Sequence, residues 1–227
     1  VRLAKPGEHR RNAALNFLSD VRLRLFAKES GLLPTHGDSG GMGEAVSDRA
    51  LYVRGYFQSH KYLESLKRRK EWTTPRPKTI TTEAQELGLR IEDKKGVILH
   101  IRRGDYKSLG DSFGMLGLDY YMRALERIEQ KSGKLGKVFV FSDEVSYVET
   151  VVVPMLSKTY DLEVIKPLSS PEQDLYAMSQ GSSFVLANSS FSWWAANLNS
   201  DQEETPVAYP QPWFRTSTFS NDLFPKG

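Results

Sequence analysis

The sequence predicts an α/β fold in which a parallel sheet carries helices on both faces. From residue 96 onward, short apolar runs alternate with segments of helical spacing, which is the pattern of successive βαβ units. The first run, GVILHI at residues 96–101, suits a strand that is buried on both faces. Because ligands of such sheets bind beyond the carboxyl ends of the strands, the polar residues that follow each strand form the candidate site.

The expected elements follow one another in order along this half of the chain. Strands are expected at residues 96–101, 136–142, 162–165, 182–188 and 206–210, and helices at 119–130, 144–156, 171–180 and 190–199. The apolar residues of the first helix recur at i, i+3, i+4 and i+7, namely Tyr121, Ala124, Leu125 and Ile128. This spacing predicts one apolar face on that helix.

Two of these helices carry start signals. Asp119 is expected to cap the helix at 119–130, because an aspartate side chain accepts hydrogen bonds from the N–H groups of a first turn. Ser170, Pro171 and Gln173 have the form of a capping box with proline at the first helical position. These residues predict where each helix begins.

The chain is expected to divide into two domains. Residues 1–88 are expected to form a partial N-terminal lobe with a linker, and residues 89–227 the lobe that carries the sheet. Within the first lobe, residues 73–88 contain two prolines and many threonines and have the composition of the linker.

The first lobe carries two features that resemble binding sites. Thr35–Asp48 is rich in glycine but lacks the strand–loop–helix setting of a phosphate loop, so an ordinary loop is favoured. A strand is expected at Leu51–Val53, followed by a helix from Ser59 that the basic cluster Lys67–Lys70 closes. Positive charge is favourable at a helix C-terminus, so a solvated helix end is favoured over a nucleic-acid patch.

Composition narrows the classes of function. With 227 residues, 39% of them hydrophobic and 26% charged, the chain is an ordinary globular protein. The net charge of +3 suits a small phosphate-bearing ligand and is too weak to imply nucleic acid. The absence of cysteine excludes disulfide scaffolds, thiolate zinc sites and cysteine nucleophiles. No apolar run approaches the roughly 20 residues that a membrane-spanning helix needs.

Three expected strands end in polar residues that would share one crevice. Arg102, Arg103 and Asp105 follow the first strand, Asp143 and Glu144 follow the second, and Asn188–Ser192 lead from the fourth into a helix. Guanidinium groups match phosphate oxygens, and hydroxyl residues that open a helix add the positive end of its dipole. An acidic residue can accept hydrogen bonds from a guanine or ribose edge. The set predicts a pocket for a nucleoside diphosphate that needs no metal.

Several of these residues have a second interpretation. Asp105 either holds an arginine side chain by an ion pair or acts directly in catalysis. His100 lies within a strand and is either a core histidine, which is favoured, or a ligand of the nucleoside. Asp143 is either a ligand or a helix cap. The Trp193–Trp194 pair is favoured as core rather than as a sugar-stacking platform, since adjacent helical residues cannot both face one site.

The triplet Arg103-Gly104-Asp105 spells an adhesion motif. It lies directly behind a buried strand, which disfavours an exposed adhesion loop. A chance occurrence is therefore favoured.

Four stretches together resemble a known family. HIRRGDY at residues 100–106 resembles the H-x-R-R-x-D signature of α1,2- and α1,6-fucosyltransferases and protein O-fucosyltransferases. VFVFSDE at 138–144 resembles the second motif of that group. LANSSFSWWAANLN at 186–199 is very similar to the third motif of the α1,2-fucosyltransferases, glycosyltransferase family 11. GYFQSHKYL at 55–63 resembles a stretch that those enzymes carry upstream.

The resemblance implies an enzyme: an inverting, metal-independent glycosyltransferase that moves L-fucose from GDP-fucose to the 2-hydroxyl of a galactoside. It also implies a two-lobed GT-B-type fold with a Rossmann-like lobe for the nucleotide sugar. Arg102 and Asp105 are the implied catalytic residues, with Arg102 on the β-phosphate. The residues implied to bind the donor are His100, Arg102, Arg103, Asp143, Glu144, Asn188, Ser189, Ser190, Phe191 and Ser192. The implied partners are GDP-fucose and a galactose-terminated glycan, with no cofactor, metal or nucleic acid.

The chain departs from the family pattern at two places. The Gly-Gly-Leu-Gly-Asn-Gln-Leu-Phe-Gln-Tyr-type segment with which the family opens has no counterpart here, so the N-terminal acceptor lobe is expected to be incomplete. Glu144 and Tyr147 stand where the second motif usually has Asp and Trp. The alternative function is a nucleotide-sugar-binding module without transfer activity. The implied location is the cytoplasm or a membrane surface in a bacterium, or the Golgi lumen in a eukaryote with an anchor upstream of Val1.

Overall fold

The computed structural model describes residues 33–34, 42–43, 60, 77–107, 114–199, 205–213 and 223. The chain divides into two compact units, Val1–Thr73 with Phe219–Gly227 and Thr74–Thr218. In the first unit, strands β1 (Leu33–Pro34) and β2 (Met42–Gly43) pair antiparallel. The stretch expected as a glycine-rich loop therefore contains a short strand. The strand expected at 51–53 and the basic cluster at 67–70 lie outside the described residues, and of the helix expected from residue 59 only His60 is described.

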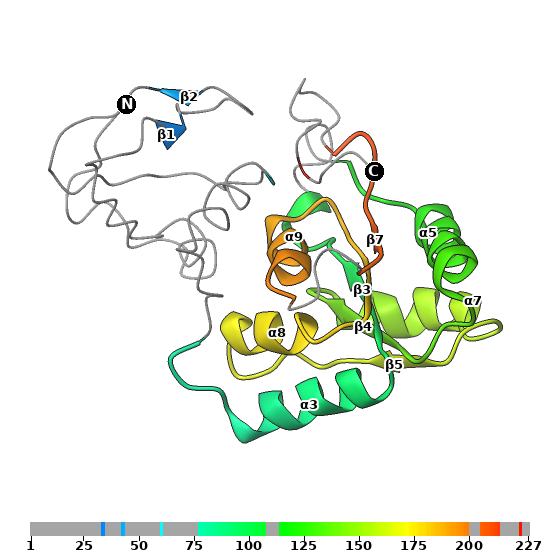
Figure 1. Cartoon of the computed structure of the whole chain (residues 1–227). Coiled ribbons are helices and arrows are strands. Elements are labelled where there is room, and N and C mark those ends of the chain that lie inside the picture. Colours follow the sequence, from blue (N-terminus) through cyan, green and yellow to red (C-terminus); the bar gives the residue numbers. More distant parts are fainter. Residues whose placement is uncertain are drawn as a thin grey trace, which may run out of the picture. The chain divides into compact units, whose positions relative to one another are not determined.

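The second unit is built on a parallel sheet of five strands (Figure 1). The strands are β3 (Val97–Ile101), β4 (Val138–Ser142), β5 (Leu162–Val164), β6 (Ser183–Val185) and β7 (Val207–Ala208). Their spatial order is β5-β4-β3-β6-β7, and each neighbouring pair runs parallel. The predicted α/β fold with a parallel sheet is confirmed, and all five strands lie where apolar runs predicted them.

The strand order determines where a ligand can bind. In chain order the five strands stand as third, second, first, fourth and fifth, which is the doubly wound, Rossmann-like arrangement. The order reverses between β3 and β6, and the crevice beyond the carboxyl ends of these two strands is the topological switch point. The loop after β3 and the turn after β6 flank it, and these are the segments in which the polar motifs lie.

Helices cover both faces of the sheet. The main ones are α3 (Thr82–Asp93), α5 (Leu118–Ser132), α7 (Val153–Leu156), α8 (Pro171–Met178) and α9 (Ser190–Asn197). Helices α5 and α7 lie on one face, and α3, α8 and α9 lie on the other (Figure 1). Right-handed crossovers between parallel strands produce this two-sided arrangement.

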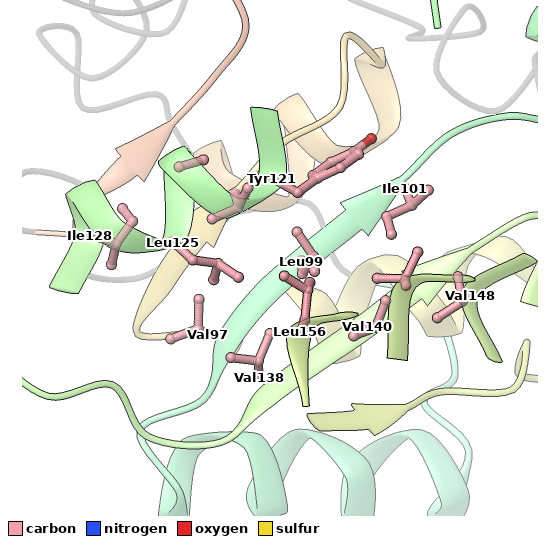
Figure 2. Close-up of a cluster of buried hydrophobic side chains, with 13 residues drawn as sticks. Val97, Leu99, Ile101, Tyr121, Leu125, Ile128, Val138, Val140, Val148 and Leu156 are labelled. Carbon is pink, nitrogen blue, oxygen red and sulfur yellow. The ribbon is translucent and has the colours of Figure 1, made fainter. Parts of the chain in front are cut away.

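The face under α5 and α7 holds a cluster of buried hydrophobic side chains (Figure 2). Alternate residues of β3 (Val97, Leu99 and Ile101) point into it together with Val138 and Val140 of β4. Helix α5 contributes the four residues that its spacing predicted: Tyr121, Ala124, Leu125 and Ile128. All five residues of β3 are buried, as expected for a central strand covered on both sides.

The helix expected at 144–156 is present with an unusual middle. It consists of α6 (Val145–Tyr147), a π-helical turn at Val148–Val152 and then α7. Val148 and Val152 are buried in the cluster of Figure 2, so the wider turn keeps the apolar residues on the sheet. Turns of this kind are often found beside functional sites.

Both predicted helix caps are wrong in their side-chain details. The N-cap of α5 is Gly117, and Asp119 instead forms an ion pair with Arg123 one turn later, at 2.9 Å. Ser170 is the N-cap residue of α8 but makes no side-chain cap bond. The Gln173 amide accepts a hydrogen bond from Thr81 N–H at 2.9 Å instead of closing a capping box. Asp119 thus pairs within its own helix, and Gln173 pairs with a segment distant in sequence.

The linker interpretation of residues 73–88 is wrong over its last part. Helix α3 begins at Thr82, and the Thr81 hydroxyl caps it by accepting from Ala84 N–H at 3.2 Å. Ala84, Leu87 and Ile91 form its buried face, which the surrounding threonines and glutamates obscure in composition. The expected division between residues 88 and 89 falls inside this helix.

Candidate functional site

Arg102 leaves the end of β3 between two carboxylates. Its Nη2 lies 2.8 Å from Asp105 Oδ1, and its Nη1 lies 2.9 Å from Asp143 Oδ2. The Arg102 side chain is 30% exposed, so the guanidinium is held in place while one side still faces solvent. The structure thus shows Asp105 in the ion-pair role that was one of its two interpretations.

Asp143 ties the loop after β3 to the end of β4. Its Oδ1 accepts a hydrogen bond from Arg103 N–H at 2.9 Å, and its Oδ2 accepts one from Gly104 N–H at 3.0 Å. The carboxylate therefore binds two consecutive backbone donors besides the Arg102 guanidinium. The N-cap residue of α6 is Glu144 rather than Asp143, so the alternative of a helix cap is not what the structure shows.

The contacts of Asp143 explain the glycine in Arg103-Gly104-Asp105. A Cβ added at Gly104 would lie 2.7 Å from Asp143 Oδ2, and that carboxylate cannot withdraw without losing its bonds to the loop. The Arg103 side chain is only 17% exposed and is paired. Gly104 and Asp105 are exposed, but the charged side chains of the triplet are both held in ion pairs, Arg103 with Glu144 and Asp105 with Arg102, which disfavours the adhesion alternative.

Arg103 has other partners than Arg102 and is clamped by two residues. Its Nε donates to Glu144 Oε2 at 3.1 Å, and its Cζ lies 3.6 Å from the centroid of the Tyr147 ring. Lys107 Nζ also bonds Glu144, at 2.5 Å. These cations, Lys107 first and Arg103 after it, hold the pKa of Glu144 below its ordinary value. The two positions at which the chain departs from the family pattern, Glu144 and Tyr147, therefore contact the same arginine.

His100 is buried within β3. It is 5% exposed, and burial together with the positive charge of Arg102 lowers its pKa from 6.5 to about 3. Its ring lies 5.9 Å from that of Phe191 on α9. Among the residues that the structure describes, none forms a hydrogen bond with its Nδ1. His100 is thus a core histidine by position, but its Nδ1 makes no hydrogen bond within the described residues.

The turn from β6 into α9 is built from buried polar residues. Ser189 is the N-cap of α9, and its hydroxyl accepts from Phe191 N–H at 3.3 Å. The Ser192 hydroxyl donates to Ala187 O at 3.4 Å and is fully buried. Of the three serines here, Ser190 is the partly exposed one. Asn188 is 2% exposed and donates from its Nδ2 to Gly114 O at 3.4 Å.

The tryptophan pair divides as the helical geometry requires. Trp193 is fully buried, and Trp194 is partly exposed with its ring at 5.0 Å and at right angles to that of Trp193. The interpretation of Trp193 as core is confirmed.

Tyr106 is a residue that sequence reasoning missed. It lies in the 3-10 turn Asp105–Lys107, is 8% exposed, and its hydroxyl donates to Asn188 O at 2.8 Å. It thereby joins the loop after β3 to the turn after β6, across the switch point. The only sequence signal for it is an aromatic residue next to a run of charges, and that pattern does not identify a partner 82 residues away.

The structure thus brings the predicted residues to one edge of the sheet. Five of them, together with Lys107, which the sequence did not single out, form what we call the ionic cluster: Arg102, Arg103, Asp105, Lys107, Asp143 and Glu144. Over the described ranges, no group of three or more His, Asp or Glu side chains is arranged to hold a metal ion. In the same part of the chain, no helix combines the length and apolar character that crossing a membrane requires.

These features define a doubly wound, Rossmann-like α/β unit whose polar side chains gather at the topological switch point. The profile of glycosyl transferase family 11 matches residues 43–217, and the chain belongs to this family. The predicted family is therefore confirmed.

Two curated relatives from Escherichia coli are similar to this chain. An alpha-1,2-colitosyltransferase is 33% identical over 164 residues, which cover 70% of this chain and 55% of the relative. The O-antigen biosynthesis glycosyltransferase WbnK is 32% identical over 126 residues, which cover 54% of this chain and 40% of WbnK. The chain spans about half the length of these relatives. Among solved structures, POFUT1 in complex with GDP is a distant likeness, with a TM-score of 0.40 and 16% identity. The match covers 57% of this chain and 46% of the POFUT1 chain.

Proposed function

We propose that this chain is a glycosyltransferase that uses a GDP-sugar, and that it moves L-fucose to the 2-hydroxyl of a galactoside with inversion and without a metal. The observation that carries the proposal is the Arg102 guanidinium, which two carboxylates hold at the switch point while 30% of the side chain stays exposed. Membership of glycosyl transferase family 11 supports it. A two-lobed GT-B arrangement belongs to the same proposal.

Arg102 is proposed to stabilise the leaving diphosphate. When the bond from the anomeric carbon to the phosphate oxygen breaks, negative charge grows on the β-phosphate, and fixed donors stabilise that change without reorganising. Asp105 and Asp143 fix the guanidinium beforehand. Asp105 is therefore proposed to act by positioning Arg102.

The diphosphate is proposed to bind through oriented hydrogen-bond donors rather than through a net positive charge of the site. The ionic cluster contains three cations and three carboxylates, so its formal charges cancel. What remains is the partly exposed Arg102 guanidinium after β3, the strand that neighbours β6, which leads into α9. Ser190 and the N–H groups of the first turn of α9 other than Phe191 N–H, which already donates to the Ser189 hydroxyl, are proposed as the second set of donors to the diphosphate, because the first N–H groups of a helix have no backbone partner within it.

His100 is the better candidate for contact with the nucleoside. Both oxygens of Asp143 already accept backbone N–H groups, and both oxygens of Glu144 are bonded to Arg103 or Lys107. Neutral His100 has an Nδ1 without a partner among the described residues, and a neutral imidazole can donate or accept at that atom. We therefore assign His100 to the nucleoside side of the pocket, with Asp143 and Glu144 holding the loop.

The similar colitosyltransferase makes colitose a second candidate sugar. Calorimetry with GDP, GDP-fucose and a nucleotide-activated colitose would rank the donors, and labelled donors with lactose would test transfer. Binding without transfer would favour the nucleotide-sugar-binding module. A preference for uridine nucleotides would overturn the proposal.

Arg102→Ala is the first variant to examine. Loss of a charge-assisted phosphate contact is expected to weaken GDP binding about ten- to hundredfold and to abolish transfer. Arg123→Ala is the matched control, because Arg123 is an exposed arginine paired on its own helix. This variant should leave GDP binding and transfer unchanged. Full transfer activity in Arg102→Ala would contradict the phosphate role.

A further inference from the structure

The two proposed sets of phosphate donors come from separate strands. Arg102 follows β3 and the first turn of α9 follows β6, so their separation depends on how the two connecting segments are held together. A diphosphate that contacts both sets requires that separation to be fixed before it binds. A contact that joins the two segments is therefore expected to affect the affinity for the diphosphate.

Tyr106 makes that contact and touches both sides. Its hydroxyl donates to Asn188 O at 2.8 Å, and the acceptor is the residue before the N-cap of α9. Its ring lies 5.7 Å from Arg102 Cζ, within the range of a cation–π interaction. Tyr106 and Asn188 are both buried, so water competes little for this hydrogen bond.

The turn that carries Tyr106 is closed by a bond within the loop itself. Lys107 N–H donates to Arg103 O at 3.1 Å, which makes residues 103–107 one compact turn. A shift of the Tyr106 hydroxyl therefore moves the backbone that carries Arg103. Asp143 holds the same loop from the β4 side, so the arginine loop is fastened to both neighbouring strands.

We propose that Tyr106 is a positioning residue, which sets the distance between the Arg102 guanidinium and the first turn of α9. The inference rests on the proposed function, because the two donor sets matter together only for a diphosphate ligand. A monophosphate needs fewer contacts and depends less on their separation. Tyr106 should consequently affect GDP more than GMP.

Tyr106→Phe is the test variant, since it keeps the ring beside Arg102 and removes the hydroxyl. Tyr120→Phe is the matched control: the Tyr120 hydroxyl also donates to a backbone carbonyl after β6, Leu186 O at 2.6 Å, but it does so from α5 and not from the arginine loop. The two variants lose the same kind of hydrogen bond to nearly the same segment.

The experiment measures GDP and GMP binding to the full chain by calorimetry and the denaturation midpoint in urea. Both variants should lower the urea midpoint by similar amounts. Tyr106→Phe should weaken GDP binding about three- to tenfold, the worth of one hydrogen bond, while GMP binding changes less than about twofold. Tyr120→Phe should leave the affinity for both nucleotides unchanged.

The outcomes separate this inference from the proposed function. If the wild-type chain binds no GDP, the proposed function fails and this inference fails with it. If the wild type binds GDP, then unchanged GDP binding in Tyr106→Phe overturns the inference alone. Equal weakening of GDP and GMP also overturns it, because that result indicates general loosening of the pocket.

Discussion

Single residues at the end of β3 have tasks that follow from what surrounds them. Asp143 accepts two consecutive backbone N–H groups and pairs with Arg102, so one carboxylate sets both the path of the loop and the direction of a guanidinium. Gly104 is needed because a Cβ there would meet that carboxylate. Arg103 is clamped by Glu144 and Tyr147, so the neighbouring arginines are held by different partners.

His100 predicts a measurable dependence of stability on pH. Because burial and Arg102 lower its pKa from 6.5 to about 3, the unfolded chain binds a proton between these values that the folded chain does not. Stability should therefore be fully present above about pH 6.5 and decrease as the pH falls toward 3, by up to about 1.4 kcal/mol per pH unit. Urea unfolding of the wild type and of His100→Gln from pH 8 to pH 4 would measure this contribution.

The difference between the two proteins isolates His100 from the carboxylates that also titrate in this range. The free energy of unfolding of His100→Gln should fall less steeply between pH 6 and pH 4 than that of the wild type. Parallel curves for the two proteins would show that His100 is not held neutral by the fold.

Among the elements, α3 shows how a side chain distant in sequence can define a helix start. Gln173 of α8 accepts from Thr81 N–H and donates from its Nε2 to Thr79 O, both at 2.9 Å. Its amide therefore pairs with the extended backbone that enters α3, and the two helices also pack against each other near Gly88. This explains why a capping box at α8 did not form.

Gln173→Ala should therefore destabilise the chain although Gln173 is not part of the ionic cluster. Two backbone groups would lose their partners, at a cost of about 1–3 kcal/mol in the free energy of unfolding. Gln85→Ala is the matched control, because Gln85 is exposed on α3 and its removal should change stability by less than about 0.5 kcal/mol. Equal urea midpoints for the two variants would mean that the hydrogen bonds of the Gln173 side chain with Thr79 and Thr81 contribute nothing to stability.

For the whole molecule, the strand order places the ionic cluster opposite α9. The order reverses between β3 and β6, so the residues that follow these two strands flank one crevice although they are far apart in the chain. Thr74–Thr218 forms the compact unit that carries these strand ends. A nucleotide bound there should stabilise that unit.

GDP should accordingly protect the chain against thermal unfolding. At a concentration about one hundred times its Kd, a ligand specific for the folded state adds about 2.7 kcal/mol, roughly 5–10 °C in Tm for a chain of this size. Differential scanning calorimetry with GDP, and with UDP at the same concentration, would measure the shift. Arg102→Ala should show little shift with GDP. Equal protection by UDP would count against a guanine-specific pocket.

The sequence alone determined the layers of this fold and the edge of the sheet at which the candidate site lies. Apolar runs and helical spacing are local properties, and the buried faces of β3 and α5 formed where these patterns placed them. Since strand ends carry ligands in parallel sheets, the motifs after β3, β4 and β6 could be assigned to one edge. Composition, in contrast, concealed α3, because its buried residues are spaced between threonines and glutamates.

Only the tertiary structure decided which partner each polar side chain takes. Gln173 had a local partner in the sequence pattern, but it binds a backbone segment more than ninety residues away. Tyr106 and Asn188 meet only because β3 and β6 are neighbours. Periodicity reports which face of an element is apolar, whereas hydrogen-bond partners depend on strand order, and that order is a property of the packed molecule.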